Sequence, residues 1–131
     1  MGYDSLMGKT VLFVTLYVAL LLEVLMTVMG FLFPTILLTK FGIAAEGGTL
    51  FLCHIITWFL LLVDGLLAFA IRAVHRKDPV GWLVSYYLGG WWLLLGISIY
   101  FLHGRPDNLV LDSLKGLILL IAAYRTDPNR S

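Results

Sequence analysis

The chain has 131 residues, 60% of them hydrophobic and only 13% charged, and its formal net charge is +1. A soluble domain has about a quarter charged residues and about half apolar ones, so this composition excludes an ordinary soluble domain. The small net charge argues against a nucleic-acid-binding protein. The single cysteine, Cys53, excludes an internal disulfide and a multi-cysteine metal site.

The apolar residues are gathered into long runs, which is typical of membrane-spanning helices rather than of a large soluble core. The first run is interrupted by Glu23 and ended by Pro34, because proline removes a backbone donor and crowds the preceding turn. The dipeptide Asp78-Pro79 predicts the start of the third helix. We expect an all-α integral membrane protein with four spans in a single domain, at about residues 11–33, 49–71, 80–102 and 109–124.

The fourth run is the weakest of the four. At the helical rise it would form a helix of about 24 Å, and Asp112 and Lys115 lie within it. Its apolar remainder, GLILLIAAY, favours a span sheltered by the other three helices. A re-entrant or interfacial segment is the alternative.

Basic residues near the helix ends predict the orientation, since they concentrate on the cytoplasmic side of a membrane. With four spans, one side receives Lys9, Arg72, Arg76, Lys77, Arg125 and Arg130, and the other receives Lys40 and Arg105. This distribution places both termini and the basic turn in the cytoplasm. Short connections make neighbouring helices antiparallel, so we expect an up-down four-helix bundle. Small residues of the third run allow close helix packing; they are Ser85, Gly89, Gly90 and Gly96.

Three carboxylates and one base lie within the predicted spans: Glu23, Asp64, Asp112 and Lys115. Charged groups at membrane depth are costly, so they face the interior of a bundle or a partner. Because acids outnumber bases, either a carboxyl group binds a proton or a neutralising partner comes from elsewhere. We therefore interpret these four residues as an intramembrane polar network that contains candidate proton or partner sites.

Structural roles are the alternatives for the same residues. Glu23 would then be a hydrogen-bonding residue between helices. Lys115 lies at a depth from which it could pair with Asp64, with Glu23, or with Asp112 on the same face of its own helix. Asp112 could instead be hydrated or cap a helix near the outer turn.

His54 lies near the outer end of the second run and has aromatic neighbours. It is either an interfacial, hydrogen-bonded histidine or an axial ligand of a haem or a chlorophyll-type pigment, paired in one version with His103. A zinc site that adds Glu46 and Asp107 to the two histidines matches no ligand spacing. We expect no metal site.

Two groups of side chains are predicted to meet lipid. The basic turn contains Arg72, His75, Arg76 and Lys77, and we expect it to fix the topology and to contact anionic lipids. The aromatic group of the third run packs or faces lipid, with a lipid, quinone or pigment surface as the alternative. Its members are Tyr86, Tyr87, Trp91 and Trp92.

Two family resemblances are visible. The segment LLLEVLMTVMG, which contains Glu23, resembles the membrane carboxylate region of the small multidrug resistance transporters, whereas the third run, YYLGGWWLLLG, departs from that family's pattern. The size and span count look like those of DoxX-type small membrane proteins, some of which are associated with oxidase or redox complexes. Neither resemblance assigns a role to a residue of this chain.

The residues leave three functional hypotheses. No nucleophile elbow, phosphate loop or metalloprotease helix is present in the sequence. The first hypothesis is therefore a non-catalytic small multi-pass subunit or assembly factor of a larger membrane complex. Redox and energy-transducing complexes are among the candidates. The second is a small proton-coupled transporter that uses Glu23 and Asp64. The third is a haem- or pigment-binding subunit that uses His54. Expected partners are membrane lipids and other membrane subunits or further copies of the chain, and not nucleic acid.

Overall fold

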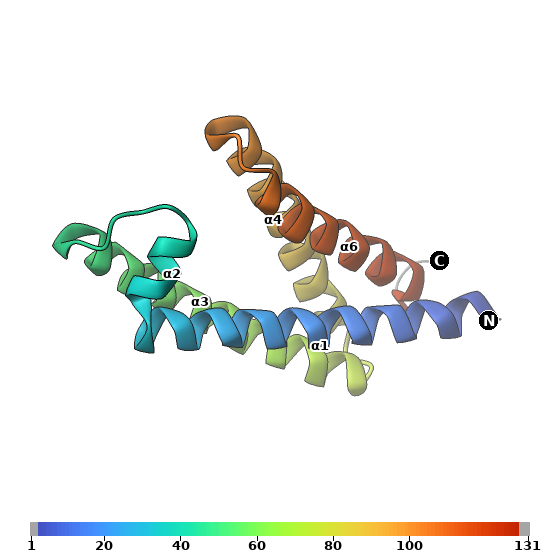
Figure 1. The fold of residues 1–131 in the computed structure, drawn as a ribbon. Coiled ribbons are helices and arrows are strands. Elements are labelled where there is room, and N and C mark those ends of the chain that lie inside the picture. The colour runs from blue at the N-terminus through green and yellow to red at the C-terminus, as the bar shows by residue number, and fades with distance from the viewer. Residues whose placement is uncertain (1–2, 129–131) are drawn as a thin grey trace. The chain divides into compact units, whose positions relative to one another are not determined.

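In the computed structural model, which describes residues 3–128, 89% of the described residues are helical and no strand occurs among them. Figure 1 shows the helices in chain order. They are α1 (Tyr3–Leu32), α2 (Pro34–Lys40), α3 (Gly47–His75), α4 (Pro79–His103), α5 (Pro106–Asn108), the π-helical η1 (Leu109–Ser113) and α6 (Leu114–Thr126). The all-helical class predicted from the sequence is confirmed.

Three of these helices are long and apolar enough to cross a membrane: the Met7–Leu32 part of α1, the whole of α3 and the whole of α4. Each exceeds the hydrocarbon thickness of about 30 Å at the helical rise of about 1.5 Å per residue. The predicted fourth span is divided, because η1 and α6 have 5 and 13 residues. At about 20 Å, α6 is too short to cross by itself.

Two predicted helix boundaries are confirmed. The first apolar helix, α1, ends at Leu32, just before Pro34, and Pro34 begins the separate helix α2. Asp78 is the N-cap of α4, where its side chain accepts a hydrogen bond from Val80 N at 3.1 Å, and Pro79 occupies the first helical position. A capping carboxylate satisfies one of the free N–H groups of a helix start, and proline has no N–H to satisfy there.

The described chain forms two compact units. Among the described residues, unit 1 combines residues 3–19 with residues 67–128, and unit 2 is formed by residues 20–66. Arg130, which contributes to the predicted charge distribution, lies outside the described residues. Both boundaries of unit 2 fall inside helices, so α1 and α3 each contribute one part to each unit.

Unit 1 is built around the packing of α4 on η1 and α6 (Figure 1). Glycines allow this contact: a Cβ on Gly89 would lie 3.0 Å from the carbonyl oxygen of Gly116, and a Cβ on Gly96 would lie 2.7 Å from that of Asn108. Gly90, in contrast, has open space around it. The predicted small-residue packing is therefore confirmed for Gly89 and Gly96. The largest fully buried side chains of unit 1 include Trp92, Leu12, Leu16, Leu67 and Leu119.

Unit 2 has a small apolar cluster in which α2 packs on neighbouring helices. Leu37 and Leu38 of α2 are buried with Cys53 of α3. The partly buried residues around them are Met26, Met29, Phe41 and Leu50. Cys53 is thus a small apolar packing residue in this cluster.

Candidate functional site

The candidate site lies in unit 2, where Asp64 of α3 meets Thr27 of α1. The distance from Thr27 Oγ1 to Asp64 Oδ2 is 2.6 Å, and the same hydroxyl oxygen lies 2.8 Å from the main-chain carbonyl oxygen of Glu23. All three residues are buried: Glu23 and Asp64 are each 8% exposed, and Thr27 is 6% exposed. The structure therefore brings two of the predicted network residues to one seam between helices.

The local sequence places these groups on facing surfaces. Glu23 and Thr27 are four residues apart, so they lie one above the other on one face of α1. Three residues further on that helix, Gly30 contacts Thr57 of α3 so closely that a Cβ on Gly30 would overlap the Thr57 hydroxyl. Thr57 and Asp64 are seven residues apart and share a face of α3. Glycine at the crossing lets the two backbones approach until a side-chain hydrogen bond can form.

Both threonine hydroxyls at this crossing have polar neighbours. Thr57, which is 1% exposed, donates its hydrogen to the Cys53 carbonyl oxygen at 2.6 Å. Thr27 has two acceptors within reach but only one hydroxyl hydrogen. The second carboxyl oxygen of Asp64, Oδ1, is buried and has no hydrogen-bond partner among the described residues. A buried polar atom without a partner is costly and marks a site that must be explained.

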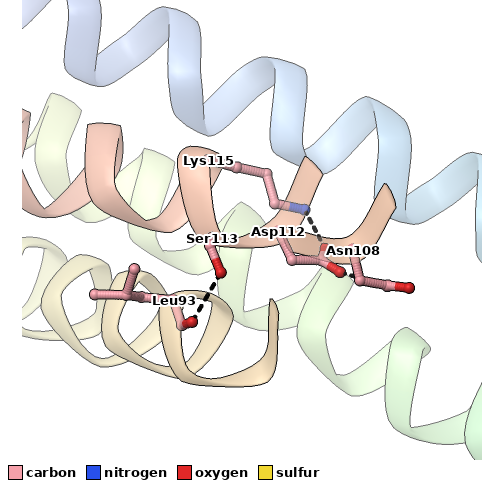
Figure 2. A network of polar contacts seen from close by, with 5 residues as sticks. All are labelled: Leu93, Asn108, Asp112, Ser113 and Lys115. Carbon is pink, nitrogen blue, oxygen red and sulfur yellow. Dashed lines mark hydrogen bonds and ion pairs between the residues drawn. The ribbon is translucent and has the colours of Figure 1, made fainter. Parts of the chain in front are cut away.

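The other two members of the predicted network lie in unit 1. Lys115 Nζ is 3.6 Å from Asp112 Oδ1, and the Asn108 side-chain amide donates to Asp112 Oδ2 at 2.8 Å (Figure 2). Lys115 Nζ also lies 4.1 Å from the ring centroid of Trp92. The local pair of Asp112 and Lys115 is thus confirmed. Since Asp64 belongs to unit 2, its salt bridge with Lys115 stays a prediction.

The π-helix η1 shapes this second cluster. A π-turn adds a residue to a helical turn and is often found at functional positions. In η1 the Ser113 hydroxyl donates to the carbonyl oxygen of Leu93 on α4 at 2.9 Å (Figure 2). The cluster thus ties Asp112 and Lys115 to the packing of α4, and its ion pair and cation–π contact give both charges a structural role.

The aromatic group of α4 divides between inward and outward positions. Trp92 is 1% exposed and lies beneath Lys115, and the Tyr86 hydroxyl donates to Asp127 Oδ2 at 2.8 Å. Tyr87 and Trp91 are exposed. The two outward side chains fit the predicted lipid-facing surface, and the two inward ones pack within unit 1.

His54 is exposed on α3, and His103 is exposed at the end of α4. Residues 3–128 contain no group of three or more histidine, cysteine, aspartate or glutamate side chains that could hold a metal ion. A haem or pigment bound through His54 stays a prediction.

The basic turn separates into two parts. His75 Nε2 is 3.0 Å from the Tyr17 hydroxyl, and its ring stacks on Phe13 with centroids 4.3 Å apart. Arg72 and Arg76 instead line a hollow. The four residues of the turn therefore do not form one cluster.

Sequence reasoning missed Thr27, Gly30 and Thr57. A polar residue four positions after Glu23 was a usable signal, because it extends a polar stripe along one helix face. The contact of Gly30 with Thr57 had no such signal, since glycine is common in apolar helices of membrane proteins.

Comparison with protein-family models, with curated proteins and with solved structures finds no match for this chain.

Proposed function

We propose that the chain is a small membrane protein that binds a proton at Asp64 and couples this binding to the transport of a small cationic or amphipathic substrate. The observation that carries the proposal is a buried carboxyl group inside a helix long and apolar enough to cross a membrane, with one oxygen bonded to Thr27 and the other without a partner among the described residues. Ionisable residues inside a membrane span are costly and mark proton or ion pathways by default.

The count of hydrogens at Thr27 supports a protonated Asp64. The Glu23 carbonyl can only accept, and Thr27 supplies one hydrogen. If Thr27 donates to this carbonyl, as threonine often does within a helix, the short contact with Asp64 requires a hydrogen on Asp64 Oδ2. A neutral carboxyl also avoids the large cost of an unpaired buried charge. The proposal therefore places one exchangeable proton between Asp64 and Thr27.

Infrared spectroscopy of the purified protein tests the proton directly. We expect the C=O stretching band of a protonated carboxyl group in the wild type and its loss in Asp64→Asn. Thr27→Val should shift the band because the hydrogen bond is removed, whereas Thr27→Ser keeps the hydroxyl and should restore it. Asp112→Asn is the matched control, since Asp112 pairs with Lys115 in unit 1. A wild-type spectrum without a band assignable to Asp64 would contradict the proposal.

Transport is tested in proteoliposomes with an imposed pH gradient and tetraphenylphosphonium as a lipophilic cation probe. We expect Asp64→Asn to reduce gradient-driven uptake to the level of empty liposomes, because the exchangeable proton is lost. Glu23→Gln should lower uptake as well, and Asp112→Asn should keep it. Equal uptake by the wild type and Asp64→Asn would exclude coupling through this carboxyl group.

A subunit of a larger membrane complex is the second candidate, and the outer surface of α3 favours it. Trp58, Leu62 and Gly65 line part of a hollow of about 440 Å³ on this helix, and Gly65 has open space around it. A small residue within an apolar hollow suits a helix of a neighbouring membrane protein. Proteins that co-purify in gentle detergent and are lost with Gly65→Leu would support this candidate. The buried position of Asp64 favours the proton site, since a side chain of a neighbouring subunit has little access to it.

Four spans with both termini in the cytoplasm remain part of the proposal. The charge distribution supports it, as do the three helices of sufficient length. In a Cys53→Ser background, we expect Lys77→Cys and Ser131→Cys to react with a membrane-impermeant thiol reagent only from the cytoplasmic side. Lys40→Cys should react only from the other side. Labelling of Ser131→Cys from the outer side would show that η1 and α6 do not cross the membrane.

A further inference from the structure

The end of α3 contains a polar hollow that the proposed transport function does not use. It has a volume of about 230 Å³ and is lined by Phe69, Arg72, Ala73, Arg76 and Asp78, all within unit 1. Arg72 and Arg76 are four residues apart, so both side chains project from one face of the last turns of α3. Both arginines therefore line the hollow from one face of α3.

The charge of this hollow is positive. Asp78 is its only lining carboxylate, and its Oδ1 already accepts a hydrogen bond from Val80 N as the N-cap of α4. Among the residues whose side chains the structure describes, neither arginine forms an ion pair with a carboxylate. The hollow therefore has two arginine charges and one carboxylate charge, and this excess of positive charge favours an anion.

The position of the hollow indicates which anion it fits. It lies at the end of α3, a helix long and apolar enough to cross a membrane. Phe69, three residues before Arg72 and thus toward the membrane, is 50% exposed. A ligand here would meet guanidinium groups at the aqueous boundary and an apolar ring on the hydrocarbon side. A phospholipid has this combination of a phosphate and acyl chains.

The other residues of the basic turn do not share this site. His75 is held by the Tyr17 hydroxyl and the Phe13 ring. Lys77 lies in the turn itself, with a φ of 58° that belongs to the left-handed region, and it does not line the hollow. A diffuse positive charge would involve all four basic residues of the turn equally. The structure instead places Arg72 and Arg76 at the hollow and His75 and Lys77 outside it.

We propose that Arg72 and Arg76 form a binding site for the phosphate of an acidic phospholipid, with Phe69 against its acyl chains. The planar guanidinium group offers paired N–H donors that match phosphate oxygens, which a point charge does not. Negatively charged lipids are enriched in the cytoplasmic leaflet, where the charge distribution places this turn. The site would hold a lipid at the junction of α3 and α4.

The test measures lipid retention by native mass spectrometry of the detergent-purified protein with phosphatidylglycerol and, separately, phosphatidylcholine. In detergent the protein has no membrane orientation, so an effect of Arg72 and Arg76 on topology does not influence the measured lipid retention. We expect the preference for phosphatidylglycerol to fall about thirtyfold in Arg72→Gln/Arg76→Gln, which corresponds to about 2 kcal/mol for two basic residues. The charge-preserving variant Arg72→Lys/Arg76→Lys should lose part of this preference for phosphatidylglycerol, because lysine lacks the paired N–H donors of a guanidinium group.

Lys77→Gln is the matched control, since it removes a basic charge from the same turn but outside the hollow. An unchanged preference in this variant would support the site. An equal loss in Lys77→Gln, or full retention in the double glutamine variant with an unchanged unfolding temperature, would overturn it. Competition by inorganic phosphate at the same concentration as the lipid would also overturn the lipid assignment, because it would show a site for free phosphate.

Discussion

Gly30→Ala is expected to destabilise the protein by about 1–3 kcal/mol, the usual cost of an added methyl group in a packed interior. The new Cβ would overlap the Thr57 side chain, which is itself buried and tied to the Cys53 carbonyl. Thr57 cannot rotate away without leaving a buried hydroxyl unsatisfied. Thermal unfolding in detergent should therefore show a lower midpoint.

The same substitution should also weaken the candidate site. Thr27 lies one turn before Gly30 on α1. Separation of α1 from α3 at Gly30 would therefore lengthen the contact between Thr27 and Asp64. We expect the infrared carboxyl band of Asp64 to shift in Gly30→Ala as it does in Thr27→Val. A single change would then affect both the stability of the protein and its proton site.

Gly90→Ala is the control for this prediction, because Gly90 also lies inside a long helix but has open space around it. It should be neutral or slightly stabilising, since alanine has the higher helix propensity. Thr57→Ala should partly rescue Gly30→Ala in a double-mutant cycle, because it removes the overlapping atoms. Equal stability of Gly30→Ala and Gly90→Ala would show that the helices are not in close contact at Gly30.

Trp92→Ala is expected to have the largest effect on stability, about 3–5 kcal/mol, as for other buried aromatic residues replaced by alanine. Trp92 is 1% exposed, and Lys115 Nζ lies 4.1 Å from its ring centroid. The substitution therefore creates a cavity and removes a cation–π contact from a largely buried ammonium group. A purified Trp92→Ala variant should unfold at a markedly lower temperature in detergent or fail to accumulate in the membrane.

The adjacent tryptophan supplies the control. Trp91 is exposed, so Trp91→Ala should cost less than about 1 kcal/mol, in the range of ordinary surface substitutions. Trp92→Phe should fall between the two, because it keeps an aromatic face for Lys115 but leaves a smaller void. Similar losses in Trp91→Ala and Trp92→Ala would contradict the placement of Trp92 in the interior of unit 1.

The packing of α4 could be predicted in part. The sequence predicts Gly89 and Gly96 as close-packing positions, because small residues in an apolar helix let the backbone of a neighbouring helix approach closely. The partner surface was not predictable, since Gly116 and Ser113 lie in a segment whose π-helical turn has no distinctive sequence pattern.

The sequence by itself determined the helical class, the apolar helices, the end of the first of them before Pro34, the start of α4 at Pro79, and the presence of costly charges within these helices. These properties depend on composition, periodicity and local backbone chemistry, which act within a few residues of one another. The Asp112–Lys115 pair was predictable for the same reason, because three residues separate its members on one helix.

Only the tertiary structure decided which polar groups meet across helices. Thr27 and Asp64 are 37 residues apart, and their contact depends on the rotation of both helices and on the room that Gly30 leaves at the crossing. The separation of His75 from Arg72 and Arg76 likewise depends on the position of Tyr17, 58 residues away. Helix rotation is fixed by side-chain packing summed over whole helices, so no local pattern in the chain reveals it.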